Sequence, residues 1–269
     1  RKLEAQGLYT MGDIARCSLG GDDDYYNEDL LYKMFGVNAE LLIDHAWGWE
    51  PCTMKDIKAY KPSVNCLSSG QVLHEPYTAK KARIIVREMT EMLVLNLVDK
   101  RLVTDQIVLT VGYDRETLSD PDVKRSYGGE ITMDRYGRSV PKHAHGTANL
   151  AGQTSSTKMI VKAVLELYDR IVNPKFLVRR ITLGANHVVD EESVVKEPVF
   201  EQMDLFTDYA ALRREQEAEE EERRRERSLQ QAMLDIKKKY GKNAILKGTN
   251  LLEGATAMER NQQIGGHRA

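Results

Sequence analysis

Apolar residues fall first at helical spacing and then at strand spacing in one stretch of the chain, Thr78 to Tyr113. Its first part repeats apolar residues on one side of a helix, which predicts a helix that faces a core. The repeating residues are Ile85, Met89, Met92, Leu93 and Leu97. Residues 104–113 then alternate between apolar and polar, which predicts a half-buried strand.

The same succession appears a second time, after a polar insertion. Residues 154–172 begin with Thr and Ser, which favour helix starts, and keep the helical spacing until Asn173-Pro174 ends the helix. Residues 176–189 alternate as a strand does. Strands are also predicted at 63–72 and 142–151, so the order becomes β-α-β-β-α-β, the ferredoxin-like split βαβ arrangement. Both helices then cover one face of the sheet, and the other face is bare.

Short helices joined by glycine turns are predicted for residues 1–54. Thr10 lies three residues before Asp13, a spacing typical of a helix cap. Gly36 is expected to end a later helix, and Asn38 to cap the next one. Amides at helix N-termini are ready ligands for phosphate. The pattern indicates a helix-hairpin-helix-like contact with a nucleic-acid backbone.

The overall charge does not point to a nucleic-acid partner. The chain has 269 residues, with 39 basic and 41 acidic side chains and a formal charge of −2, so local patterning must decide. Cys17, Cys52 and Cys66 are scattered, which fits three thiols in a reducing cytosol rather than a metal site. No apolar run approaches the length of a membrane span. We therefore expect neither a metal nor a membrane as a partner.

Several strings resemble the thumb and little finger of Y-family translesion DNA polymerases, most of all those of the UmuC-like branch. They are GLYTMGDIARCS, LYKMFGVNAELLIDHAWGWEP and KPSVNCLSSGQV, and the end ATAMERNQQIGGHRA is similar to the ends of such proteins from Gram-positive bacteria. The resemblance implies a helical thumb at 1–54, a DNA-binding little finger at 62–198, and a clamp-binding peptide with a charged helical tail at 199–269. The fold class is then α+β.

The resemblance also implies a function without catalysis in this chain. In the family, the palm and fingers precede the thumb and carry the metal-binding carboxylates and the nucleotide site. Magnesium is therefore expected only in that catalytic half, and no catalytic residue is assigned here. We expect the DNA-binding half of an error-prone polymerase of the DNA-damage (SOS) response, located in the cytoplasm, that grips the phosphates of primer-template DNA.

The resemblance assigns DNA contacts residue by residue. In the family, the little finger lays its sheet on DNA and holds phosphates through main-chain amides and basic side chains, without reading the sequence. The matching residues are Ser63, Asn65, Ser68, Ser69, Lys142, His143, Arg179 and Arg180, with Gly36 and Asn38 in the thumb. The pair Arg179-Arg180 is the strongest of these; the alternative is a solvated strand end.

A peptide after the last strand, Gln202-Met203-Asp204-Leu205-Phe206, resembles the peptide that binds the bacterial β sliding clamp. In such peptides the Gln hydrogen-bonds at the rim of a pocket and the Leu-Phe pair inserts into it. A buried aromatic side chain offsets the entropy lost when a short peptide is ordered. The alternative is a packing turn that places Leu205 and Phe206 against the little finger.

The tail contains a charged block and a short amphipathic helix. Residues 213–228 favour a solvated helix or disorder, because they are almost all charged. Leu229, Met233, Ile236 and Tyr240 follow at helical spacing. This helix either docks on a partner, a regulatory or recombinase protein being the candidates, or folds back on the body. The Gly-, Asn- and Gln-rich end is expected to be flexible.

Two functions from other classes stay open. An RNA-binding module has the same β-α-β-β-α-β order, but it expects stacking aromatics on its central strands, and the strand at 142–151 has none. The other alternative is a protein adaptor built around the tail helix. Truncation after Glu201 distinguishes the adaptor from the DNA-binding fragment, since an adaptor should lose its partner whereas a DNA-binding body should keep DNA.

Overall fold

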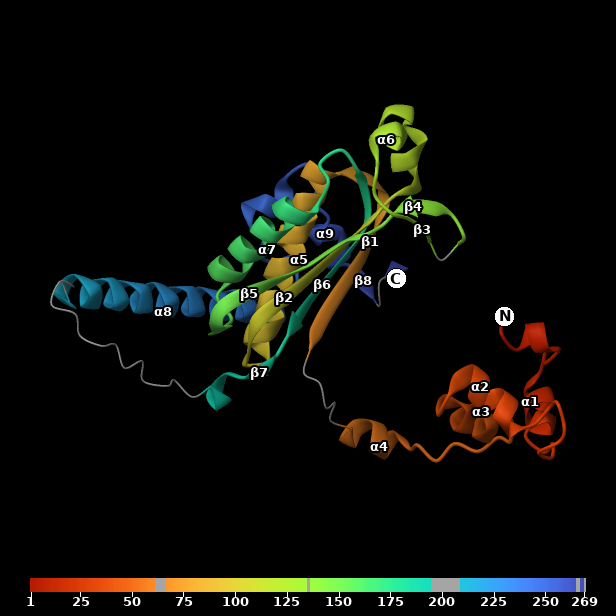
Figure 1. The fold of residues 1–269 in the computed structure, drawn as a ribbon. Helices are drawn as coiled ribbons and strands as arrows, with labels where there is room; N and C mark the ends of the chain where they lie inside the picture. Colours follow the sequence, from red (N-terminus) through yellow and green to blue (C-terminus); the bar gives the residue numbers. More distant parts are fainter. Residues whose placement is uncertain (61–65, 135, 195–208, 265–266, 269) are drawn as a thin grey trace. The chain divides into compact units, whose positions relative to one another are not determined.

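Two compact units make up the chain, residues 1–63 and 64–269 (Figure 1). The computed structural model describes residues 1–60, 66–134, 136–194, 209–264 and 267–268. Across these described ranges, no helix is both long and apolar enough to cross a membrane.

The first unit is helical. Its helices are α1 (Met11–Cys17), α2 (Glu28–Phe35), α3 (Asn38–Ala46) and α4 (Met54–Ala59), and a 3-10 turn η1 (Glu4–Gln6) precedes them. The predicted start of α1 is confirmed, because Thr10 Oγ1 accepts a hydrogen bond from the Asp13 amide (3.1 Å) and the Asp13 carboxylate accepts one from the Thr10 amide (2.8 Å). Leu31 and Ala39 are fully buried in the core of this unit.

Four long antiparallel strands form the centre of the second unit. They are β1 (Leu67–Thr78), β2 (Leu102–Tyr113), β5 (Ala144–Thr154) and β6 (Leu177–Asn186), in the order β1-β6-β2-β5, and the short β7 (Val189–Asp190) pairs with β2. Helix α5 (Ala79–Asp99) joins β1 to β2, and α7 (Thr157–Ile171) joins β5 to β6. The predicted succession of elements and the α+β class are confirmed.

The order of the strands differs from the ferredoxin-like prediction. In a ferredoxin-like sheet, the strands that begin the two βαβ units lie at the centre; here the centre is β6 and β2, the strands that end them. Strand composition accounts for this order. Pro76 in β1, and Gly146 and Gly152 in β5, suit edge strands, whereas β2 and β6 are rich in Val, Ile and Leu.

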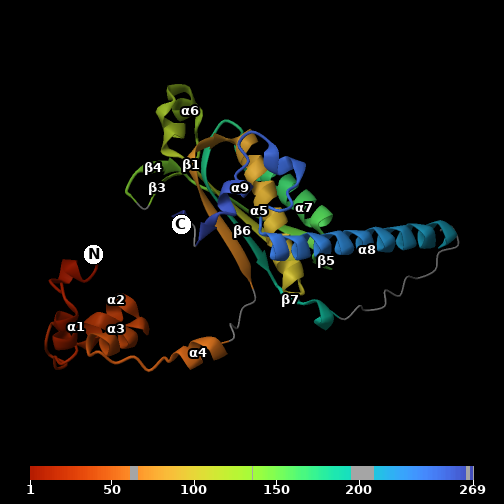
Figure 2. The same cartoon turned by 180° about the vertical axis from the view of Figure 1, so that it is seen from behind.

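Helices α5 and α7 pack on one face of the sheet (Figures 1 and 2). The strand side chains that face them are fully buried, among them Ile107, Leu109, Ile181 and Leu183. Strand β5 lies very close to α7 at Gly146, where an added Cβ would lie 2.8 Å from Leu167 Cδ1. All large apolar strand residues on this face therefore contribute to one core.

An arm between β2 and β5 leaves the sheet at one end. It contains the 3-10 turn η2 (Arg115–Ser119), α6 (Pro121–Ser126), β3 (Ile131–Met133) and β4 (Ser139–Pro141). The arm is anchored to β6, because the Asp114 amide donates to the Leu177 carbonyl (2.8 Å). The rings of Tyr113 and Tyr127 each pack edge-to-face on Phe176, with centroids 5.0 Å apart.

Helix α8 (Tyr209–Tyr240) continues the chain after a 3-10 turn, η3 (Glu191–Ser193). Its charged part is an exposed helix with ion pairs one turn apart, such as Arg223 with Glu219 at 3.0 Å, which confirms the solvated helix. Gln230, Met233 and Leu234 are buried, so the helix folds back on the domain. Leu229 and Tyr240 of the predicted apolar stripe are exposed instead.

The end of the chain, which we expected to be flexible, packs beside α5. It forms the 3-10 turn η4 (Gly248–Leu251), α9 (Ala257–Arg260), β8 (Gln263–Ile264) and β9 (His267–Arg268). Its anchor is Glu88 of α5, which is 5% exposed. The Glu88 carboxylate accepts hydrogen bonds from the amides of Thr256 (2.9 Å) and Ala257 (3.2 Å) and from Asn250 Nδ2 (2.8 Å).

Candidate nucleic-acid interface

The sheet face opposite α5 and α7, here called the open face, is lined by short polar side chains. Cross-strand partners share a face, so the register gives its members. They are Ser68, Gly70 and Val72 of β1; Arg180, Thr182, Gly184 and Asn186 of β6; Gln106, Val108, Thr110 and Gly112 of β2; and His145, Thr147 and Asn149 of β5. All are exposed or half-buried, and none carries a carboxylate. These groups can therefore donate hydrogen bonds to an anion.

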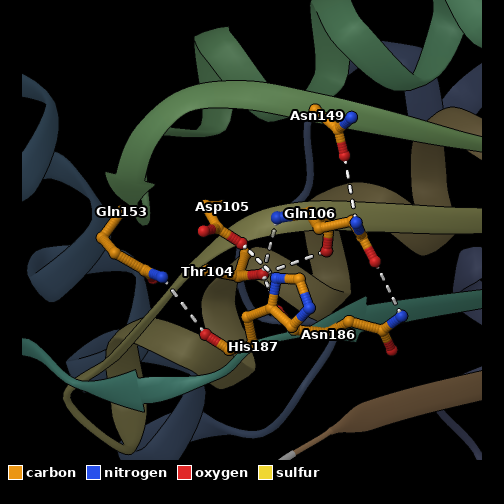
Figure 3. A network of polar contacts seen from close by, with 7 residues as sticks. All are labelled: Thr104, Asp105, Gln106, Asn149, Gln153, Asn186 and His187. Atoms are coloured by element: carbon orange, nitrogen blue, oxygen red, sulfur yellow. Dashed lines mark hydrogen bonds and ion pairs between the residues drawn. The ribbon is translucent and has the colours of Figure 1, made fainter.

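A row of side-chain amides crosses three strands of the open face (Figure 3). Gln106 Nε2 donates to Asn149 Oδ1, and Asn186 Nδ2 donates to Gln106 Oε1, both at 3.0 Å. Beside the row, Asp105 Oδ1 lies 2.8 Å from His187 Nδ1. This row was not predicted from the sequence, although each amide occupies a polar position of an alternating strand.

The two arginines of the predicted pair have different surroundings. Arg180 is exposed on the open face next to Gly112, and its side chain has no hydrogen bond or ion pair with the described residues. Arg179 Nη1 donates to the His74 carbonyl (2.8 Å), and its Nε lies 3.8 Å from the Asp114 carboxylate. Arg180 is thus the member placed to meet a phosphate, while Arg179 holds neighbouring segments together.

The two predicted serines in β1 lie on opposite faces. Ser68 is exposed on the open face, whereas Ser69 Oγ accepts a hydrogen bond from Arg260 Nη2 (2.7 Å) on the other side. The prediction that both lie on the bare face is wrong for Ser69, because successive strand residues alternate between faces. The predicted contacts Ser63 and Asn65 lie outside the described residues.

Lys142 and His143 lie just before β5. Lys142 Nζ is 2.6 Å from Glu130 Oε2, and this hydrogen bond raises the pKa of Lys142, so the cation is kept but is already paired. His143 is exposed, and its ring centre lies 6.5 Å from that of His145. His145 Nδ1 is 2.9 Å from Thr110 Oγ1 on the open face. The structure therefore adds His145 to the candidate residues.

The two predicted thumb contacts belong to the first unit. Gly36 ends α2 with φ 60°, which favours glycine, and Asn38 is the first residue of α3. Both are exposed. The prediction that Asn38 caps α3 is wrong: Val37 occupies the cap position, because the Gly36 turn leads directly into the helix. Their contact with phosphate stays a prediction.

The clamp-binding prediction is not tested by the described structure. Its residues Gln202, Met203, Asp204, Leu205 and Phe206 lie outside the described residues. Among the residues that are described, no three His, Cys, Asp or Glu side chains gather as a metal site would require. Within the described residues, the open face carries the predicted contacts Ser68 and Arg180.

Comparison with known proteins identifies relatives of this chain. The C-terminal domain of the impB/mucB/samB family matches residues 66–204, which is more than half of the chain. A putative UV-damage repair protein, UvrX, from Bacillus subtilis (strain 168) is 25% identical over 271 residues, which cover 100% of this chain and 52% of that protein. The chain thus spans about half the length of this relative. The matched range begins within one residue of β1 and includes the whole sheet. The chain belongs to the impB/mucB/samB family, the UmuC-like group of Y-family proteins that its sequence resembles.

Proposed function

We propose that the second unit binds duplex DNA through the open face, without reading base sequence, as part of a translesion DNA repair protein. The observation that carries the proposal is the open face itself: amides, hydroxyls and the unpaired Arg180, with no carboxylate among them. Such groups donate to phosphate oxygens, and phosphate contacts position a protein on DNA without specifying sequence. The printed name of the relative, a UV-damage repair protein, supports the repair context.

The chain would act as the DNA-holding part of a polymerase rather than as a catalyst. Primer-template DNA is the proposed substrate, and polymerisation with its magnesium would belong to a catalytic half in a longer protein. The first unit, with Gly36 and Asn38, would add phosphate contacts of its own. Because the open face has little formal charge, we expect its DNA affinity to depend only weakly on salt.

Fluorescence anisotropy of labelled primer-template DNA across a salt series tests this function. Arg180→Ala should weaken binding about tenfold and lower the salt slope by ~0.9, the contribution of one phosphate contact to duplex binding. Arg170→Ala is the matched control, because Arg170 is exposed on α7, on the other side of the sheet. Arg179→Ala should change domain stability more than the salt slope, since its guanidinium is already engaged.

Equal binding by the Arg180→Ala and Arg170→Ala variants would remove the open face as the DNA site. An RNA-binding module would instead prefer single-stranded RNA of a particular sequence. That alternative is less favoured, because the open-face positions of the central strands β2 and β6 include no Phe, Tyr or Trp on which a base could stack.

The peptide from Gln202 to Phe206 would dock the chain on the bacterial β sliding clamp. The support is its sequence alone, a Gln followed by a Leu-Phe anchor. Surface plasmon resonance with immobilised clamp should show loss of binding for Leu205→Ala/Phe206→Ala. Asp204→Ala is the control, since this position supplies no apolar anchor. Equal binding by both variants would leave the peptide without this role.

A further inference from the structure

The hairpin of β3 and β4 presents three large apolar side chains to solvent. Ile131, Met133 and Tyr136 are 49%, 66% and 79% exposed. They fall within six consecutive residues, and neither the core nor the open face uses them. Apolar groups gathered on a surface in this way mark a site of interaction.

The hairpin is fixed at its tip and at its base. At the tip, the Asp134 carboxylate accepts hydrogen bonds from the amides of Tyr136 (2.8 Å) and Arg138 (2.9 Å) and from Arg138 Nε (2.6 Å). The bond from the Arg138 side chain lowers the pKa of Asp134. At the base, the Glu130 carbonyl accepts from the Tyr127 hydroxyl (2.9 Å), and the Tyr127 ring packs against the domain. A two-stranded hairpin is marginal alone, so these bonds are what present Tyr136 in a defined position.

The ring of Tyr136 lies beside a cation. The guanidinium carbon of Arg138 is 4.9 Å from the ring centre, a cation–π distance. A planar ring with an arginine against it can stack on a base, and Asp134 holds that arginine in place. Stacking of this kind does not depend on which base is present, since every base has a π face.

Charge and position favour nucleic acid as the occupant. Residues 130–143 contain two acidic residues, Glu130 and Asp134, and three basic ones, Arg135, Arg138 and Lys142, a formal charge of +1 in a chain of −2. The hairpin follows the end of β2 and precedes the start of β5, which is the end of the sheet where Arg180 lies. Figures 1 and 2 both draw it beyond that end of the sheet and apart from α7. DNA held on the open face would therefore reach the hairpin.

We propose that the β3–β4 hairpin is a second nucleic-acid contact of this domain and that Tyr136 stacks on an unpaired base of the DNA held on the open face. The inference rests on the proposed function and adds to it a contact with an unpaired base. A ring can stack only on a base whose face is accessible. The preferred DNA is therefore a primer-template or gapped DNA with unpaired bases rather than a closed duplex.

Anisotropy with the full chain and two DNAs tests the contact: a primer-template with a single-stranded overhang, and a closed duplex of equal length. Tyr136→Ala should weaken binding of the overhang DNA about 5-fold or more and leave the closed duplex unchanged, while Tyr136→Phe keeps both affinities. The matched control is Tyr240→Ala in α8. Tyr240 is 67% exposed, and Lys239 Nζ lies 5.2 Å from its ring centre. A 5-iodouracil in the overhang should crosslink within residues 131–141.

The design separates failure of the hairpin from failure of the open face. Arg180→Ala must weaken both DNAs. If it weakens neither, the proposed function falls and the hairpin contact falls with it. If Arg180→Ala weakens both but Tyr136→Ala behaves like Tyr240→Ala, or loses both DNAs equally, the stacking on an unpaired base is overturned while the open face stands. A crosslink outside 131–141 overturns it as well, and a protein would then be the candidate occupant of the hairpin.

Discussion

Removing the buried carboxylate of Glu88 should release the end of the chain from α5. Glu88→Ala deletes an acceptor of three hydrogen bonds and leaves the Thr256 and Ala257 amides without it. A hydrogen bond to a charged group contributes ~1.5–3 kcal/mol, and bonds in one network do not add. We therefore expect docking of residues 248–263 to weaken by about 3 kcal/mol, the upper end of that range, because the part-buried Thr256 amide and the buried Ala257 amide lose their acceptor.

Hydrogen exchange measured by mass spectrometry reports this docking directly. A loss of ~3 kcal/mol corresponds to exchange more than a hundredfold faster in residues 248–263, with protection of β6 retained. Glu253→Ala is the matched control, because Glu253 pairs with Lys81 at 2.7 Å but its side chain is 86% exposed. Such an exposed pair contributes ~0–1 kcal/mol. Exchange in Glu88→Ala that stays within fivefold of the Glu253→Ala rate would refute the anchoring role.

Two further changes probe the core of the second unit and the start of α1. Gly146→Ala should destabilise the second unit by ~1–3 kcal/mol in urea unfolding, because the new Cβ would meet buried Leu167. The control is Gly152→Ala on the same strand, where an added Cβ meets nothing within 4 Å, so the free energy of unfolding should change little. Equal losses in the two variants would contradict the packing argument. The Thr10 hydroxyl, with nearby amides, lowers the pKa of Asp13 to about 2. The Asp13 carboxylate therefore stabilises α1 fully at pH values above its unfolded-state pKa near 3.8, and this stabilisation is lost as the pH falls through about 2. An NMR titration of Asp13 with a midpoint near pH 3.8 would argue against the cap.

The spacing of apolar residues predicted the helices and strands of this fold better than it predicted which strands are neighbours. The long helix after Thr78 and the strand ending at Tyr113 follow from apolar spacing, and the structure has both. Strand order is a different matter, since alternation alone says which side chains share a face and not which strands are neighbours. The Pro and Gly residues of β1 and β5 were the available signal for edge strands.

The candidate site was only partly accessible to sequence reasoning. The basic pair was found, but a register irregularity beside Arg179 sends the two side chains to different partners, and no period reveals such an irregularity. The packing of the C-terminal segment was missed because that segment has few apolar residues. Its signal was Glu88 together with Glu91, two carboxylates one turn apart in the apolar period of this helix, where partners were required.

Helix α8 sets the distance between two points of the chain. Arg227 of α8 is ion-paired with Glu191, close to where the chain leaves the sheet, and Tyr209 at the start of the helix is 18 residues away. At 1.5 Å per residue, the helix sets the two ends of the intervening chain about 27 Å apart. The segment that carries the peptide from Gln202 to Phe206 therefore starts and ends at points whose separation is set by the helix and not by the peptide. Removing whole turns from the exposed half of α8 would shorten this separation without touching the peptide or the sheet.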